Sequence, residues 1–160
     1  MARLDRVHPA MRDSLLAMPC PTFDSTPWVT GPPVSQRRVA VISTAGLHRR
    51  NDRPFPITAG SGRAVPGDYR VIPGDVAANE LVMSHISTNF DRTGFQQDWN
   101  VVFPLDRLHE LADQRYIGSV AAFHYSFMGA TEPKIMEPAA RQLARLMQQD
   151  QVDAVLLVPV

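Results

Sequence analysis

The chain has 160 residues, 44% hydrophobic and 20% charged, so it is long enough to bury one hydrophobic core. Its 16 basic side chains balance its 16 acidic ones, which argues against a broad nucleic-acid surface or a polybasic membrane anchor. No apolar run reaches the roughly 18 residues that a membrane helix needs, and the N-terminus has no apolar signal-peptide core. We therefore expect a cytoplasmic protein with no nucleic-acid or membrane partner.

Residues 1–36 have the composition of an arm that precedes a domain at 37–160. A short amphipathic helix is expected between Asp5 and Met18. The Pro-rich stretch 19–34 that follows is incompatible with a helix or a central strand. Trp28 is expected to dock this arm onto the domain.

Three near-continuous apolar runs predict buried strands at residues 38–44, 119–129 and 153–160. Between the first two, the stretch 47–74 is rich in proline and glycine and is expected to be a functional loop. A short helix at 75–88, leading into a strand near 82–85, is expected next.

Two helical patterns alternate with these runs. Asp106, with Pro104 just before it, is expected to be the N-cap or a first-turn acid of one helix, and Gly118 is expected to close it. The second helix is expected at 132–149, where Pro138 either kinks the helix or marks its start. Strand–helix alternation predicts the α/β class, with an open parallel layered sheet of Rossmann or flavodoxin-like type. Because the sequence stops at the tip of an apolar strand, the sheet is expected to be incomplete at its C-terminal side.

Ligands of open parallel sheets bind beyond the carboxyl ends of the strands. His48, His85 and His124 fall at or near such ends and could form an acid–base cluster, because imidazole titrates near neutral pH. They could also bind a divalent metal together with Asp91 or Asp98, or serve as hydrogen-bonded structural residues. The neighbouring candidates for binding substrate at this edge are Ser43, Thr44, Gly46, Tyr125 and Ser126.

The glycines do not form a GxGxxG or Walker A motif, and there is no GxSxG sequence. The one cysteine, Cys20, excludes an intrachain disulfide, and no activating group is evident near it. No cofactor is therefore identifiable from the residues themselves.

Six segments occur in the order found in the glycine, sarcosine, betaine and D-proline reductase selenoprotein B family. They are STAGLH, YRVIPGD, ELVMSH, QDWNVVFPLDRLHELA, IGSVAAFHYSFMG and DAVLLVPV. The chain resembles this family from about Val34 to Val160, and within it the selenocysteine-containing subunit of D-proline reductase.

The resemblance implies an oxidoreductase that reductively cleaves a carbon–nitrogen bond in a small amino acid or a derivative of one. The nucleophile of this family is a selenolate, or a thiolate in some relatives, directly after the strand that corresponds to residues 153–160. Selenocysteine is therefore expected immediately after Val160, with a cysteine a few residues on. Because a stop codon encodes selenocysteine, the sequence is expected to be truncated there, and the chain alone inactive.

The resemblance further implies a small-molecule substrate, a partner reductase subunit or thiol donor, and a homo-oligomer. The histidines His48, His85 and His124 are expected to donate a proton to the leaving amine and to orient the substrate. Two other functions stay open from the residues: a non-catalytic docking module for a partner subunit, and a histidine-based metal-dependent enzyme.

Overall fold

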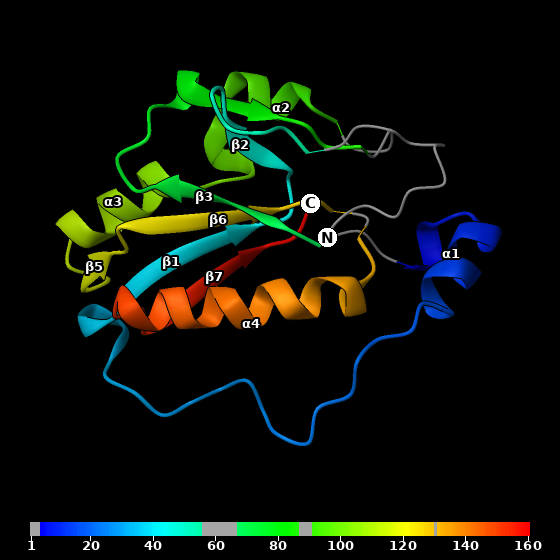
Figure 1. The fold of residues 1–160 in the computed structure, drawn as a ribbon, viewed down its shortest axis with the longest axis horizontal. Coiled ribbons are helices and arrows are strands. Elements are labelled where there is room, and N and C mark those ends of the chain that lie inside the picture. Colours follow the sequence, from blue (N-terminus) through cyan, green and yellow to red (C-terminus); the bar gives the residue numbers. More distant parts are fainter. Residues whose placement is uncertain (1–3, 56–66, 87–90, 130) are drawn as a thin grey trace.

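The structure is a computed structural model that describes residues 4–55, 67–86, 91–129 and 131–160. Its central strand, β1 (Arg38–Ser43), pairs in parallel with β7 (Ala154–Val158) on one edge. On its other edge it pairs in parallel with β5 (Ser119–Val120) and then with β6 (Phe123–Phe127). The carboxyl ends of β1, β6 and β7 therefore lie at one end of the molecule, close to the C-terminus (Figure 1).

The predicted α/β class is confirmed, but the sheet is mixed rather than all-parallel. The strand β3 (Tyr69–Pro73) pairs with β6 in antiparallel orientation. It lies in the stretch 47–74, which was expected to be a loop; residues 56–66 of that stretch lie outside the described residues. Only Ile72 of β3 is buried, so this edge strand lacks the continuous apolar run that marks a central parallel strand.

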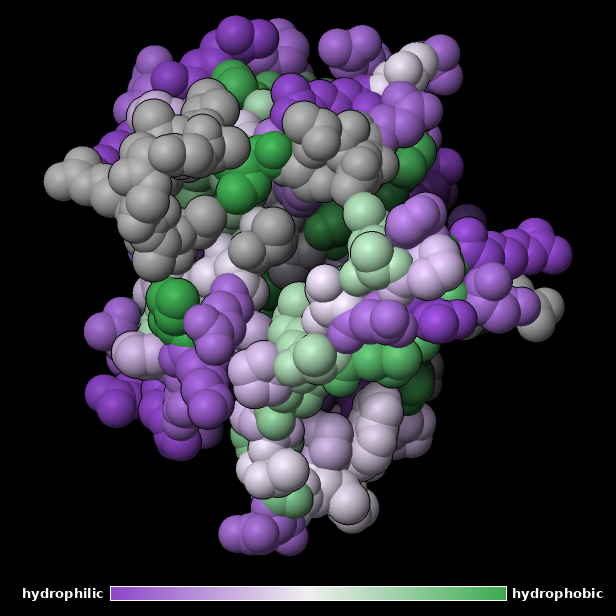
Figure 2. Space-filling model, turned by 90° about the vertical axis from the view of Figure 1, so that its right-hand side faces the viewer, coloured by the Kyte–Doolittle hydropathy of each residue, from purple (hydrophilic) through white to green (hydrophobic). Residues whose placement is uncertain are grey.

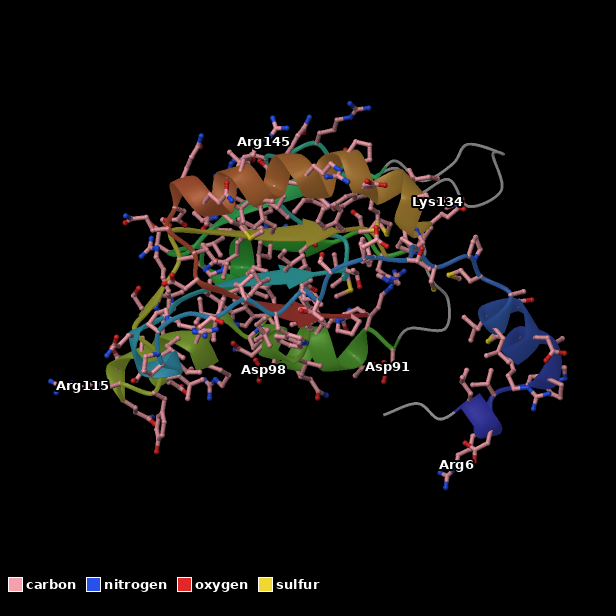
Figure 3. All side chains as sticks on the ribbon, turned by 90° about the horizontal axis from the view of Figure 1, so that it is seen from below. Arg6, Asp91, Asp98, Arg115, Lys134 and Arg145 are labelled. Atoms are coloured by element: carbon pink, nitrogen blue, oxygen red, sulfur yellow. The ribbon has the colours of Figure 1, made fainter. Side chains whose placement is uncertain are left out.

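A second, two-stranded sheet contains β2 (Leu47–Arg49) and β4 (Leu81–Met83), which pair in antiparallel orientation. Together with α3 (Leu105–Asp113) it covers one face of the main sheet, while α4 (Pro133–Gln149) covers the other. Figure 3 shows the sheet between these layers, with Asp91 and Asp98 on the side opposite Lys134 and Arg145. The remaining helices are α1 (Pro9–Leu16), α2 (Thr93–Gln97) and the 3₁₀ turns Leu4–Arg6, Val34–Gln36, Ala78–Glu80 and Trp99–Val101.

The two predicted helices are confirmed, and so is Asp106 as a first-turn acid of α3, but the end of α3 differs from the prediction. Its N-cap is Pro104, and Asp106 is a first-turn acid whose carboxylate accepts hydrogen bonds from Trp99 Nε1 and Asn100 Nδ2, both at 2.8 Å. The helix ends well before Gly118. A Cβ on Gly118 would lie 2.5 Å from the carbonyl carbon of Gln36, so this position requires glycine for a close backbone approach.

The expected docking of the arm through Trp28 is wrong, because this side chain is 87% exposed. The helix α1 forms within the predicted range, but none of its residues is buried. The aromatic content of the stretch could not reveal this, because exposure depends on what the body offers for it to pack against.

His124 lies where the pairing of β1 with its neighbour is interrupted. Arg38 faces Ser119 and Ile42 faces Tyr125, so β1 has fewer residues than its neighbour between these two pairs. The Val41 N–H donates to Nδ1 of the buried His124 ring, at 2.9 Å, in place of a strand carbonyl. The imidazole therefore completes the hydrogen bonding of the central strand. Burial lowers the pKa of His124 to about 4.

We predict that the pH dependence of stability reports this histidine. Its pKa falls from 6.5 in the unfolded chain to about 4 in the fold, so the unfolded chain binds the proton more strongly. The stabilisation is fully present above pH 6.5 and is lost as the pH falls towards 4, by about 3 kcal/mol. Urea denaturation across this range measures it. His124→Asn retains an acceptor for Val41 without titrating, so its stability should change less; parallel curves for the two proteins would contradict the assignment.

The outer edge of β7 pairs with no described strand. Its side chains Val155, Leu156 and Leu157 are 38%, 39% and 67% exposed. The segment Ala154–Val158 contains no charged residue or proline, the features that normally protect an edge strand from pairing with another chain. This edge is thus an apolar surface open to association.

We predict that the 160-residue chain self-associates through β7, and that Leu157→Lys shifts it towards the monomer because a charge cannot be buried unpaired between apolar strands. Sedimentation velocity over a concentration series measures the effect. Leu111→Lys is the matched control, since Leu111 is 37% exposed on α3, away from the edge. A monomeric wild-type chain, or equal effects of both substitutions, would contradict the prediction.

Candidate functional site

Thr44 ties together the ends of three parallel strands. Its N–H donates to the Val158 carbonyl at 3.1 Å, and its carbonyl accepts from the Gly129 N–H at 2.7 Å. Its Oγ1 accepts from the Val160 N–H at 2.8 Å and lies 3.2 Å from the Val160 carbonyl oxygen. The predicted substrate-binding residue Thr44 therefore lies on the carboxyl-end rim, but its hydrogen bonds hold the backbone.

His85 reaches the same rim from the segment after β4. A Cβ built on Gly129 would lie 2.7 Å from His85 Nε2, 2.7 Å from the Val160 carbonyl oxygen and 3.0 Å from the Thr44 carbonyl oxygen. The imidazole and the two carbonyl oxygens thus converge on the space that a side chain at position 129 would occupy. Figure 2 looks onto this end of the molecule, where hydrophobic residues are exposed over part of the surface.

Gly46 shapes the rim from the other side. It has φ +67°, which favours glycine, and a Cβ there would lie 2.9 Å from Met128 Cε and 3.3 Å from the backbone nitrogen of His85. Its N–H donates to the Phe127 carbonyl at 2.9 Å, and its carbonyl accepts from the Ser84 N–H at 2.9 Å. Gly46 therefore permits the close approach of the His85 segment to the end of β6.

His48 lies behind the rim rather than on it. Its ring is buried and bonds to the Arg49 carbonyl through Nδ1 and to Ser84 Oγ through Nε2, both at 2.8 Å. His124 lies within the sheet, against Phe103 in an edge-to-face contact with ring centroids 5.9 Å apart. The three predicted histidines are therefore not gathered into one cluster, and His85 is the one at the rim.

The other predicted substrate-binding residues are buried. The Ser43 Oγ accepts from the Ala45 N–H at 3.2 Å, and the Ser126 Oγ accepts from the Leu47 N–H at 2.8 Å. Tyr125 is 1% exposed, and burial raises the pKa of its hydroxyl. The two serine hydroxyls hold the backbone below the rim; the predicted contact of all three residues with substrate stays a prediction.

Within the described ranges, no group of three or more His, Cys, Asp and Glu side chains is arranged to hold a metal ion. Asp91 accepts from the Thr93 N–H at 2.8 Å, and Asp98 accepts from the Nδ2 and the N–H of Asn100, both at 2.9 Å. These bonds lower the pKa of both carboxyls. Both acids thus serve local turns. Among the same residues, no helix has the length and apolar character needed to cross a membrane.

Sequence reasoning missed two residues of this site. Ser84 lies between His48 and the His85 backbone, and Arg92 donates from its guanidinium to the His85 carbonyl. The only sequence signal for Ser84 is that it precedes His85 in the segment ELVMSH, and Arg92 has none.

Comparisons with known proteins agree with the resemblance in the sequence. The chain is 32% identical over 141 residues to the D-proline reductase subunit gamma of Acetoanaerobium sticklandii, covering 81% of this chain and 54% of that protein. It is 27% identical over 143 residues to the glycine reductase complex component B subunit gamma of Symbiobacterium thermophilum, covering 87% of this chain and 32% of that protein. The chain thus spans about half and one third of these relatives. No solved structure matches it.

The family model of glycine/sarcosine/betaine reductase selenoprotein B matches residues 16–160. The match begins earlier than the expected Val34, so it includes most of the Pro-rich arm. Because it spans nearly the whole sequence, the chain belongs to the glycine/sarcosine/betaine reductase selenoprotein B family.

Proposed function

We propose that this chain forms the front part of a reductase subunit that cleaves a carbon–nitrogen bond in a small amino acid or a derivative of one. The observation that carries the proposal is the position of Val160 at the rim, held by Thr44 and beside His85. The relatives named for D-proline and glycine reductases support an amino-acid substrate. We further propose that the nucleophile, a selenocysteine or cysteine, follows Val160 directly and is absent from the chain described.

In this proposal the reaction is a two-electron reduction. The nucleophile and a nearby thiol would supply the two electrons and become a selenenyl sulfide or a disulfide. The carbon–nitrogen bond breaks, the carbon takes one proton, and the nitrogen takes another and leaves as an amine. Among the described residues we assign the proton on nitrogen to His85, a buried side chain (3% exposed) whose Nε2 lies beside Gly129 and the Val160 carbonyl. Thr44 holds the strand end in place, and His48 and His124 contribute indirectly.

We also propose that further polypeptide covers β7 and extends the sheet into a Rossmann- or flavodoxin-like layered fold. The exposed Leu156 and Leu157 support this, since an interior parallel strand buries both faces. The same surface supports the second candidate function, docking onto a partner subunit, and the relatives' names describe subunits and a complex. The proposed subunit is cytoplasmic and forms a homo-oligomer. The metal-dependent alternative has no supporting arrangement among the described histidines.

We predict that the protein isolated from its source extends beyond Val160 and carries selenium or a cysteine thiol at the next position. Digestion followed by mass spectrometry should yield a peptide that contains the segment DAVLLVPV and continues past it, with the selenium isotope pattern if selenocysteine is present. Alkylation under reducing conditions should label that residue. An intact mass of 17.8 kDa, with Val160 as the last residue, would overturn the reductase proposal and leave docking.

We predict that Gly129→Ala disturbs the rim. The added Cβ would lie 2.7 Å from both His85 Nε2 and the Val160 carbonyl oxygen, so the His85 ring or the strand end must move. The expected cost is about 2 kcal/mol of unfolding free energy, with displaced His85 ring signals in NMR spectra. Gly94→Ala in α2 is the matched control, because the nearest atom to its Cβ would be 3.6 Å away. Equal stability of the two variants would show that the rim is looser than described.

A further inference from the structure

The hydrogen bonds of His48 fix which of its nitrogens carries the proton. The Arg49 carbonyl oxygen, 2.8 Å from Nδ1, can only accept, so Nδ1 donates to it. In the neutral ring Nε2 then has a lone pair, and it accepts from the Ser84 hydroxyl at 2.8 Å. The Ser84 hydroxyl thus donates to the His48 ring, and the ring donates in turn to the Arg49 carbonyl, in one chain of hydrogen bonds.

Ser84 connects this chain to the segment that carries His85. Its backbone N–H donates to the Gly46 carbonyl at 2.9 Å, while its hydroxyl is held by His48. One residue on, the His85 carbonyl accepts from the guanidinium of Arg92. The backbone before His85 is therefore fixed by Gly46 and His48, and the backbone after it by Arg92.

The hydrogen bonds of the His48 ring indicate that it acts through this chain rather than on a ligand. His48, Ser84 and His85 are all buried, at 4%, 6% and 3% exposed, and the hydrogen bonds described occupy both nitrogens of the His48 ring. Leaving the buried His48 Nε2 without a hydrogen-bond donor costs stability. Removing the Ser84 hydroxyl should therefore change the orientation of the His48 ring or of the backbone at residue 84. Because His85 follows Ser84 directly in the chain, this change should displace the His85 side chain.

We infer that Ser84 is a positioning residue, whose hydroxyl links the His48 ring to the backbone of His85 and thereby sets the place of the His85 imidazole beside Gly129 and Val160. This inference rests on the proposed function in one respect: the proton that His85 supplies there. It assigns His48 an indirect role through Ser84.

The test compares Ser84→Thr with Ser84→Val in the 160-residue chain. The two side chains have nearly the same shape and differ by the hydroxyl, so any strain from the added methyl is common to both. NMR spectra that correlate ring nitrogens with ring protons report the tautomer of His48 and the environment of His85. Ser84→Ala, which removes only the hydroxyl, serves if the larger side chains prevent folding.

The threonine variant should keep the Nδ1-protonated His48 and the wild-type His85 ring signals. The valine and alanine variants should show roughly tenfold faster solvent exchange of the His48 ring proton, together with displaced His85 signals. Unchanged His85 signals in the valine and alanine variants would overturn the inference, as would a threonine variant that behaves like valine.

This experiment is independent of the nucleophile. If mass spectrometry finds Val160 at the end of the native protein but the threonine and valine variants differ as expected, the reductase proposal fails and the positioning role of Ser84 stands. If the native protein continues with selenium or a thiol while the His85 signals do not depend on the Ser84 hydroxyl, the reductase proposal stands and the positioning role of Ser84 fails.

Discussion

The hydrogen bonds of Thr44 hold the carboxyl ends of β1, β6 and β7 in one place. Its backbone joins the end of β1 to Val158 and Gly129, and its hydroxyl bonds to Val160. Gly129 and Val160 take their positions from this junction, and both meet His85 at the rim. A threonine serves here since it offers a donor and an acceptor in addition to those of its backbone.

The sequence predicted the elements that have a continuous apolar run or a long helical stripe. The strands β1 and β7 and the helix α4 lie where their patterns placed them. The strand β4 overlaps the strand expected near 82–85, whereas β2 has only three residues, too few for a period-two pattern to emerge, and β3 buries only Ile72. Pattern identifies an element by its buried face, so a strand with few buried residues, such as β3, escapes it.

The candidate site could be predicted as an edge of the sheet but not as a set of contacts. His85 and Thr44 lie at the rim, as strand-end reasoning expected. His124 does not, because its ring accepts from Val41 at a break in the strand pairing that depends on two extra residues in the neighbouring strand. His48 points to Ser84, a contact between positions 36 residues apart that only the β2–β4 pairing creates.

The pairing of β1 with β7 also orders events during synthesis. Arg38 at the start of β1 bonds to Asp153, 115 positions later in the chain. At roughly 5–20 residues per second, translation needs about 6–23 s to cover that interval. Throughout this time the central strand has at least one edge unmatched, and both edges until β5 and β6 have been made. Chaperones that bind extended apolar segments therefore have a window of seconds on residues 38–43, before β7 arrives and closes the centre of the sheet.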